Sequence, residues 1–216
     1  MQNKFHLELD DFGLLMPGLD DLLRIKQHYP DFKMTCFTVP FPKEFFYKPN
    51  QKHFSREKYR KWAEIVNSYD WIQVAMHGFG HSHFEFDCTY EKADTMLKAA
   101  ENLWDEVGLK YVKIFRAPYW QYSYDAIHAL KDRGYVVAID RNNPRPVPPG
   151  TKVYIYNWSF EEPLPGDPII KGHGHFTGRN KNNINDTLGN ILHHLPRNSE
   201  FIFISEYLEK YEERRK

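Results

Sequence analysis

Residues 5–13 read Phe-His-Leu-Glu-Leu-Asp-Asp-Phe-Gly, and this stretch decides how the rest of the chain is interpreted. The apolar run before Asp10 predicts a buried strand, and the glycine after the aspartates predicts a turn. Asp10 and Asp11 therefore stand together where a buried strand ends, although adjacent like charges repel each other. Such a pair either caps a turn or belongs to a functional site.

The composition fits a chain with a single large core. Its 216 residues are 41% hydrophobic and 16% aromatic, so we expect one domain over residues 1–216. The 29 basic and 29 acidic side chains balance, which argues against nucleic acid or an anionic membrane as the partner. No apolar run reaches the length of a signal-peptide core or a membrane span, and Cys36 and Cys88 are too few for a disulfide framework. These features predict a cytoplasmic protein.

Short apolar runs alternate with amphipathic stretches along the chain. The apolar runs predict strands at Phe5–Asp11, Met34–Pro40, Trp71–His77, Val112–Pro118, Val136–Asp140, Val153–Trp158, Pro168–Gly172 and Phe201–Ser205. Helices are predicted at Tyr90–Gly108, from Ser123 toward Gly134, at Asn183–Leu195 and at Glu206–Lys216. Strands that alternate with helices predict a parallel sheet with helical crossovers. About eight such units favour an α/β fold of the closed or nearly closed (β/α) barrel type over an open sheet.

Polar side chains cluster just after several of the predicted strands. In parallel α/β barrels, functional groups gather at the carboxyl ends of the strands. Besides Asp10 and Asp11, those ends supply His77, His81, His83 and Glu85 after the third strand, Arg116 and Tyr119 after the fourth, Asp140 after the fifth, and His173 and His175 after the seventh. This convergence favours a functional site over a set of unrelated structural roles.

Asp11, His77 and His81 form a ligand set for a catalytic divalent ion. Three protein ligands leave one position open for water, and an Asp-His-His set suits zinc, cobalt, nickel or iron. His77 and His81 are four residues apart, so one helical turn or a compact loop brings both imidazoles to one ion. Gly78 and Gly80 between them permit a tight backbone path.

A cation bound to Asp11 explains why Asp10 stays ionised beside it. Asp10 is then free to take a proton from an attacking water, and Arg116 orients this carboxylate and keeps it charged. A histidine of the Gly-His-Gly-His stretch at 172–175 gives a proton to the leaving group. Backbone N–H groups near Tyr119, together with the ion, stabilise the oxyanion. These roles describe the hydrolysis of an acyl compound.

These segments, in this order, resemble the polysaccharide deacetylase family, the NodB-homology carbohydrate esterases. The resemblance covers the chain from Phe5 to Phe176. It implies a distorted (β/α) barrel that removes N- or O-linked acetyl groups with one divalent metal ion, zinc being the metal that the family favours. It implies that Asp10 is the base, that Asp11, His77 and His81 bind the metal, that Arg116, Pro118 and Tyr119 form the Arg-x-Pro-Tyr motif, and that His173 is the acid, with His175 as its rival.

The chain departs from the family pattern in three places. Phe12 stands between the aspartate pair and Gly13, and Gly78 replaces the usual Ser or Thr after the first metal histidine. Asp140 follows the fifth strand, but no second Asp followed by Trp comes after it. The first two changes keep the ligands. The third leaves open how Arg116 is tuned and what borders the sugar pocket.

The sequence therefore predicts a metal-dependent deacetylase, a hydrolase acting on carbon–nitrogen bonds other than peptide bonds, with a small-molecule or oligosaccharide substrate that carries acetyl groups. The alternative is an amidohydrolase of the same fold that acts on a small non-sugar amide or imide. A two-metal phosphoesterase is disfavoured, because the chain has neither an Asp-x-His after the first strand nor a later Gly-Asn-His. A catalytically inactive binding module is disfavoured too, because every proposed catalytic residue type is present.

Four further residues lie near the predicted site. His83 is expected to be a supporting or surface residue, since a fourth protein ligand would close the metal site. Glu85 either anchors the loop after His77 or contacts the substrate. Tyr119 and Trp120 either pack in the core or stack on a sugar ring.

Overall fold

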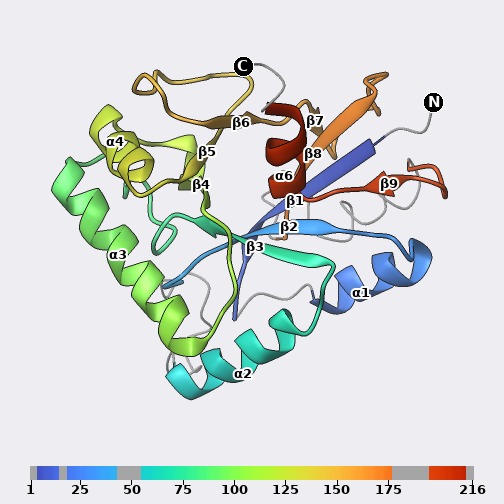
Figure 1. Cartoon of the computed structure of the whole chain (residues 1–216), viewed down its shortest axis with the longest axis horizontal. Coiled ribbons are helices and arrows are strands. Elements are labelled where there is room, and N and C mark those ends of the chain that lie inside the picture. The colour runs from blue at the N-terminus through green and yellow to red at the C-terminus, as the bar shows by residue number, and fades with distance from the viewer. Residues whose placement is uncertain (1–3, 15–18, 43–54, 177–194, 213–216) are drawn as a thin grey trace.

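The computed structural model describes residues 4–14, 19–42, 55–176 and 195–212, and they form a curled parallel sheet flanked by helices (Figure 1). The strand order is β6-β5-β4-β3-β2-β1-β8-β7, with β9 beside the start of β1. The strands are β1 (Lys4–Phe12), β2 (Met34–Thr38), β3 (Ile72–His77), β4 (Ile114–Arg116), β5 (Val136–Ile139), β6 (Val153–Ile155), β7 (Trp158–Ser159), β8 (Ile169–His175) and β9 (Glu200–Phe201). This is the distorted (β/α) barrel that the sequence predicts, so that prediction is confirmed.

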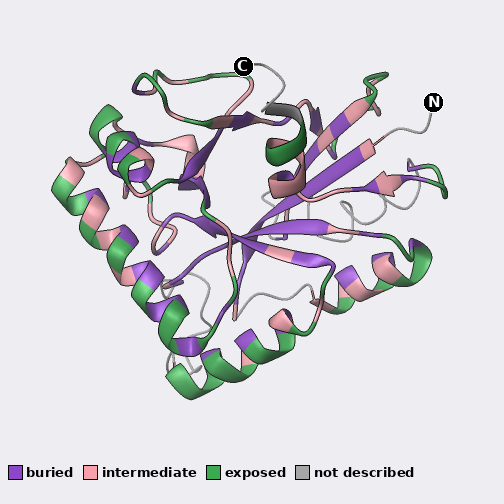
Figure 2. Cartoon of the chain, in the orientation of Figure 1, coloured by how far each residue is buried: buried purple, intermediate pink, exposed green. Residues whose placement is uncertain are grey.

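Four helices cover the outside of the sheet with their apolar faces (Figures 1 and 2): α1 (Leu19–His28), α2 (Arg56–Asn67), α3 (Tyr90–Val107) and α4 (Tyr124–Asp132). A further helix among the described residues, α6 (Ile204–Tyr207), follows β9. Two predicted boundaries are confirmed: Gly108 ends α3 with a φ of 73°, and the Ser123 side chain caps α4 by accepting from the N–H of Ala126. None of the helices in these ranges combines the length and the apolarity that crossing a membrane requires.

The two faces of β1 enter different environments. Leu7 and Leu9 join the apolar core between the sheet and the outer helices. The alternate residues, among them His6 and Glu8, point to the enclosed inner face, because successive side chains of a strand face opposite ways. There the His6 ring lies 4.5 Å from the ring of Tyr207, the last residue of helix α6. The C-terminal segment thus covers the amino-terminal end of the barrel, which leaves the carboxyl ends of the strands for the site.

The sequence predicts one strand over Val153–Trp158, and this is wrong. Residues Val153–Ile155 form β6 at one end of the strand order, whereas Trp158 begins β7 at the other end. Asn157 makes the break, because its side chain accepts from the N–H of Lys171 at 2.6 Å and donates to the carbonyl of Ile169 at 3.0 Å. Both partners lie on β8, so the chain crosses the open side of the barrel at this point.

The strand predicted at Phe201–Ser205 is also wrong in its second half. β9 ends at Phe201, and Ile204 begins helix α6. The carboxylate of Glu206 accepts the N–H of Phe203 at 2.6 Å, which favours a helix start over a continued strand.

Other predicted elements have different bounds. The helix predicted at Glu206–Lys216 begins earlier, with α6, and continues as a turn of π-helix at Leu208–Glu212. The helix predicted at Asn183–Leu195 lies outside the described residues except for Leu195. β8 extends through His175, so both of its histidines lie inside the strand instead of after it.

Candidate metal and catalytic site

A β-bulge at the end of β1 brings the two aspartates to the same site. Leu9 is paired with Cys36 and Phe12 with Thr38, so β1 advances three residues where β2 advances two. Asp11 has a φ of 67°. In a regular strand, neighbouring side chains would point to opposite faces, but a bulge changes the direction of the side chains in it. Both carboxylates therefore point toward the carboxyl end of the barrel.

Asp11 lies between the two histidines of the loop after β3. Its Oδ1 is 2.9 Å from Nε2 of His81 and 3.5 Å from Nε2 of His77. Burial alone would raise the pKa of Asp11, but hydrogen bonds and charge from the two imidazoles hold that pKa well below its usual value. The structure thus brings together the three residues for which the sequence predicts metal binding.

The arrangement of these three groups fits a divalent ion. Their ligand atoms all lie within 4.8 Å of one another. Two ligand atoms at zinc bonding distance from a tetrahedral ion are about 3.4 Å apart, close to the distances from Asp11 to the two imidazoles. His77 donates from Nδ1 to the carbonyl of Arg116 at 3.2 Å, which leaves its Nε2 lone pair on the side of Asp11. Asp11, His77 and His81 would therefore hold the ion.

Glu85 holds the loop that carries His81. Its carboxylate accepts the backbone N–H groups of Phe79, Gly80 and Ser82 at 2.7, 3.0 and 3.0 Å. Of the two roles that the sequence leaves open for Glu85, these hydrogen bonds correspond to anchoring of the loop. The loop is a compact turn and not a helix, with positive φ values at Gly78 (63°) and His81 (59°).

Gly78 is required in this loop for a second reason, which explains the departure from the family pattern. A Cβ at this position would lie 2.2 Å from a carboxylate oxygen of Glu85 and 2.5 Å from the ring of Pro118. A Ser or Thr would therefore displace the anchor of the loop.

Asp10 forms a second group with Arg116 and the histidines of β8. Nη1 of Arg116 donates to Oδ1 of Asp10 at 2.6 Å and to Nδ1 of His173 at 3.0 Å. Nε2 of His175 lies 3.8 Å from Oδ2 of Asp10. Burial would raise the pKa of Asp10, but Arg116 and the surrounding histidines lower it to about 2. Asp10 is therefore ionised at neutral pH.

Arg116 also bonds a carboxylate that sequence reasoning missed. Its Nη2 donates to Oε1 of Glu8, and both side chains are fully buried. Glu8 lies two residues before Asp10, on the same face of β1, and opposite His173 in the ladder with β8. A sequence signal existed, since His6, Glu8 and Asp10 alternate with leucines in a strand that is buried on both faces.

The two β8 histidines differ in their surroundings. The His173 side chain is 6% exposed, and its ring lies 4.8 Å from the ring of Tyr156 and 5.4 Å from that of Trp120. The His175 side chain is 43% exposed. His173 is therefore enclosed beside Arg116, and His175 lies nearer the opening.

Aromatic residues of the segment Pro118–Trp120 border both groups. The Tyr119 ring stacks on the ring of His83 with centroids 3.6 Å apart and lies 5.1 Å from the ring of His81. The Trp120 ring covers the guanidinium of Arg116 at 4.6 Å. Both aromatic residues are half-buried and contact the site, and His83 supports Tyr119 instead of approaching Asp11.

Asp140, the acidic residue after β5, has local partners. It accepts from the hydroxyl of Tyr156 at 3.2 Å and from the N–H of Asn142 at 3.0 Å. The Tyr156 ring in turn stacks beside Trp120, with centroids 5.7 Å apart. Asp140 therefore holds Tyr156, one of the aromatic residues that border the site.

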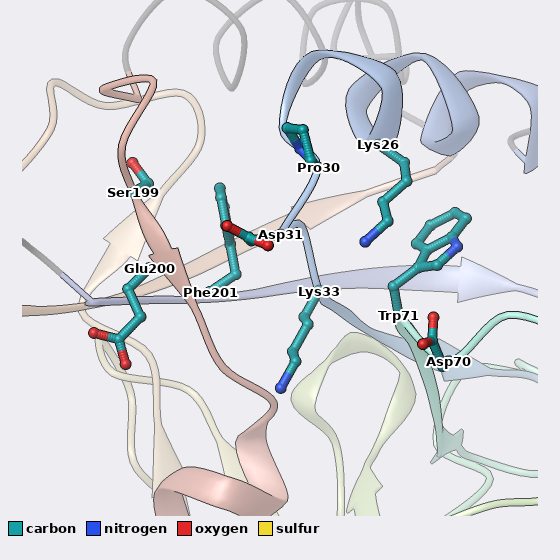
Figure 3. Close-up of a pocket in the computed structure, with 9 residues that line it drawn as sticks. All are labelled: Lys26, Pro30, Asp31, Lys33, Asp70, Trp71, Ser199, Glu200 and Phe201. Atoms are coloured by element: carbon teal, nitrogen blue, oxygen red, sulfur yellow. The ribbon is translucent and has the colours of Figure 1, made fainter.

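A cavity of about 420 Å³ lies at the opposite end of the strands (Figure 3). Its lining carries charges of both signs, and neighbours pair with them: Lys33 with Glu206 at 2.6 Å and Glu200 with Lys4 at 2.7 Å. The lining residues are Lys26, Pro30, Asp31, Lys33, Asp70, Trp71, Ser199, Glu200 and Phe201. This cavity lacks the convergent carboxylates and imidazoles found at the carboxyl ends.

Comparison with known proteins defines the fold. No protein-family model and no curated protein matches the chain, but solved structures do. A protein of Mycobacterium smegmatis, provisionally described as a polysaccharide deacetylase, superposes with a TM-score of 0.65 at 11% identity, over 99% of this chain and 91% of that one. A family 4 carbohydrate esterase from Streptomyces lividans gives 0.54 at 15% identity, over 88% and 84%. The chain therefore has the fold of the NodB-homology polysaccharide deacetylases.

The same fold also occurs without activity. A family 4 pseudoenzyme from Bacillus anthracis superposes with a TM-score of 0.59 at 12% identity, over 96% of this chain and 66% of that one. An activity for the present chain must consequently be argued from its own residues.

Proposed function

We propose that this protein is a metal-dependent deacetylase that hydrolyses acetyl groups from an N- or O-acetylated sugar. The observation that carries the proposal is the bulge in β1. It turns Asp10 and Asp11 to one end of the barrel, where Asp11 lies beside two imidazoles and Asp10 beside a guanidinium. In the proposal, these two adjacent residues therefore have different roles: Asp11 is a metal ligand and Asp10 is the base.

The metal site in the proposal consists of Asp11, His77 and His81, with one divalent ion, zinc by preference. Such an ion, when bound, supplies Lewis acidity toward a carbonyl oxygen and lowers the pKa of water. The three side chains would hold the ion, and Glu85 keeps the loop in the shape that His81 needs.

Asp10 is the general base of the proposed reaction. Arg116 holds one carboxylate oxygen, Oδ1, at 2.6 Å, and Oδ2 lies toward the metal group, 3.8 Å from Nε2 of His77. A carboxylate held ionised in this orientation takes a proton from the attacking water as the water adds to the acetyl carbonyl. The depressed pKa of about 2 keeps the base available throughout the neutral range.

His173 is the proposed acid: protonated on both nitrogens, it donates its Nε2 proton to the leaving nitrogen or oxygen and becomes a neutral imidazole. Its Nδ1 lies 3.3 Å from Oε1 of Glu8, on the side away from the substrate, so Nε2 is the nitrogen presented to the leaving group. The more exposed His175 is the rival for this role. The backbone N–H near Tyr119 is the proposed oxyanion donor.

The sugar part of the proposal is supported by the fold and by the aromatic border. The Streptomyces lividans neighbour is a carbohydrate esterase, and Tyr119 and Trp120 provide ring faces beside the catalytic groups on which a sugar can stack. The presence of a complete ligand and base set argues against a role limited to binding.

The test is acetate release from N-acetylated chito-oligosaccharides and O-acetylated xylan by the protein loaded with zinc or cobalt. We expect acetate from at least one substrate, and His173→Gln should lower kcat more than His175→Gln. Turnover of small amides or imides without any sugar deacetylation would overturn the sugar assignment. Sugar binding without turnover under every metal would overturn the enzyme assignment.

A further inference from the structure

Glu8 is a buried carboxylate that is not needed to balance the charge of Arg116. Arg116 already forms a neutral pair with Asp10, so Glu8 adds a surplus negative charge. Its Oε2 is buried without a hydrogen-bond partner among the described residues. Burying a charge in this way costs stability. A residue kept at such a cost suggests a role in the function of the site.

The contacts of Arg116 indicate that role. The guanidinium lies between two rings, with its central carbon 4.0 Å from the ring centre of Phe37 and 4.6 Å from that of Trp120. Contacts with these rings hold the guanidinium in place but do not set where its N–H groups point. Two hydrogen bonds at different nitrogens set that direction, because Nη1 donates to Asp10 and Nη2 donates to Glu8.

Glu8 also lies beside the proposed acid. Its Oε1 is 3.3 Å from Nδ1 of His173, and Arg116 donates to that nitrogen only while it carries no proton. An imidazole that carries a proton on both nitrogens needs an acceptor at Nδ1, and the carboxylate provides one. Asp140, the acidic residue that follows β5, bonds Tyr156 and Asn142 instead.

We propose that Glu8 is a positioning residue: it fixes the orientation of Arg116, and through Arg116 that of Asp10, and it supports His173 at Nδ1. This inference rests on the proposed function for its kinetic consequence, but the orientation of Arg116 can be measured separately. The supporting carboxylate comes from Glu8, within the first strand, and not from Asp140 after β5.

The kinetic test compares Glu8→Leu with Glu8→Gln. Leucine fills the space without an acceptor, so kcat for acetate release should fall about 10- to 100-fold, as for other supporting residues of metal sites, with KM and metal content unchanged. Glutamine keeps an oxygen that can accept from Nη2, so it should restore part of kcat. A role in packing alone predicts the reverse, since leucine is the better buried residue.

Glu101 provides a matched control outside the site. It is nearly buried and accepts from Nη1 of Arg133 at 2.5 Å and from the hydroxyl of Tyr135 at 3.1 Å. Glu101→Gln should lower the thermal stability and leave kcat unchanged. An unchanged kcat in folded, metal-loaded Glu8→Leu would overturn the proposal.

A second measurement needs no known substrate and no variant at Glu8. In ¹⁵N-arginine-labelled wild-type protein, a guanidinium anchored at both ends should give separate, slowly exchanging Nη signals. The signal is assigned to Arg116 by its loss in Arg116→Lys. A single averaged Nη signal would overturn the role of Glu8, whereas an inactive wild-type protein with an anchored guanidinium would count against the proposed function alone.

Discussion

The two aspartates of the bulge differ in their charged neighbours. Asp11 lies close to His77 and His81, and Asp10 lies close to His77, His173 and His175. The Asp10 carboxylate is also bonded by a guanidinium, that of Arg116. Because Arg116 already holds one oxygen of this carboxylate, Asp10 attracts a divalent ion less strongly than Asp11 does.

This difference teaches how adjacent like residues can take different roles. The imidazole nitrogens of His77 and His81 face Asp11, and a carboxylate with two imidazoles suits a divalent cation. Asp10 is held ionised by a fixed cation of the protein, which suits a base. The comparison predicts that a change at one group can leave the other intact.

The largest expected effect comes from Asp10→Asn. The amide keeps the shape and removes the base, so kcat/KM for deacetylation should fall about 10²- to 10⁴-fold. Steady-state acetate release measures it. Activity close to that of the wild type would mean that Asp10 is not the base.

A large effect on stability is expected from Gly78→Ala. The new Cβ meets Glu85 and Pro118 at a positive φ, so the free energy of unfolding should fall by about 3 kcal/mol or more. Gly134→Ala is the matched control, because its φ is 79° with no atom within 4 Å of the new Cβ. It should cost about 1 kcal/mol. If a urea titration shows the same loss of unfolding free energy in both variants, the predicted clash of a side chain at position 78 with Glu85 and Pro118 is contradicted.

A smaller effect is expected from Glu85→Gln. The loss of charge weakens three hydrogen bonds to the loop of His81, so metal affinity should fall about 10- to 100-fold. Competition with a chelating dye measures this affinity. Glu57→Gln, at an exposed pair with Lys61, serves as the control and should bind metal as the wild type does. An unchanged affinity in Glu85→Gln would mean that the loop keeps its shape without the anchor.

The most gradual effect is a loss of metal in acid. Burial would lower the pKa of His77, but Asp10 and Asp11 raise it above its ordinary value. A protonated imidazole does not bind metal, and a raised pKa makes protonation begin at a higher pH. Below that pKa, affinity should fall about tenfold per pH unit for each proton displaced. Affinity independent of pH between 7 and 5 would contradict histidine ligation.

Much of this architecture could be predicted from the sequence. The strands that precede Asp10, His77 and Arg116 are short apolar runs with polar ends, and parallel strands bring such ends together. The β6–β7 break was missed because Tyr156 and Asn157 interrupt the apolar run only briefly. It depends on long-range hydrogen bonds from Asn157 to β8, which no local pattern contains.

The sequence predicts most of the residues that gather at the candidate site, but it does not predict which of them contact one another. Glu8 looks like an ordinary polar residue in a strand, because its meaning depends on Arg116, which is 108 positions away in the chain. The bulge at Asp11 likewise depends on the register with β2. Distances between strand ends decide which histidine lies near which aspartate, and those distances come only from the folded chain.

The most direct test of the account is the metal content of purified wild-type protein, Asp10→Asn and Asp11→Asn, measured by elemental analysis after incubation with zinc. The account predicts about one ion per chain in the wild type and in Asp10→Asn, and none in Asp11→Asn. Loss of the ion in Asp10→Asn, a second ion in the wild type, or no ion at all would contradict the division of roles between the two aspartates.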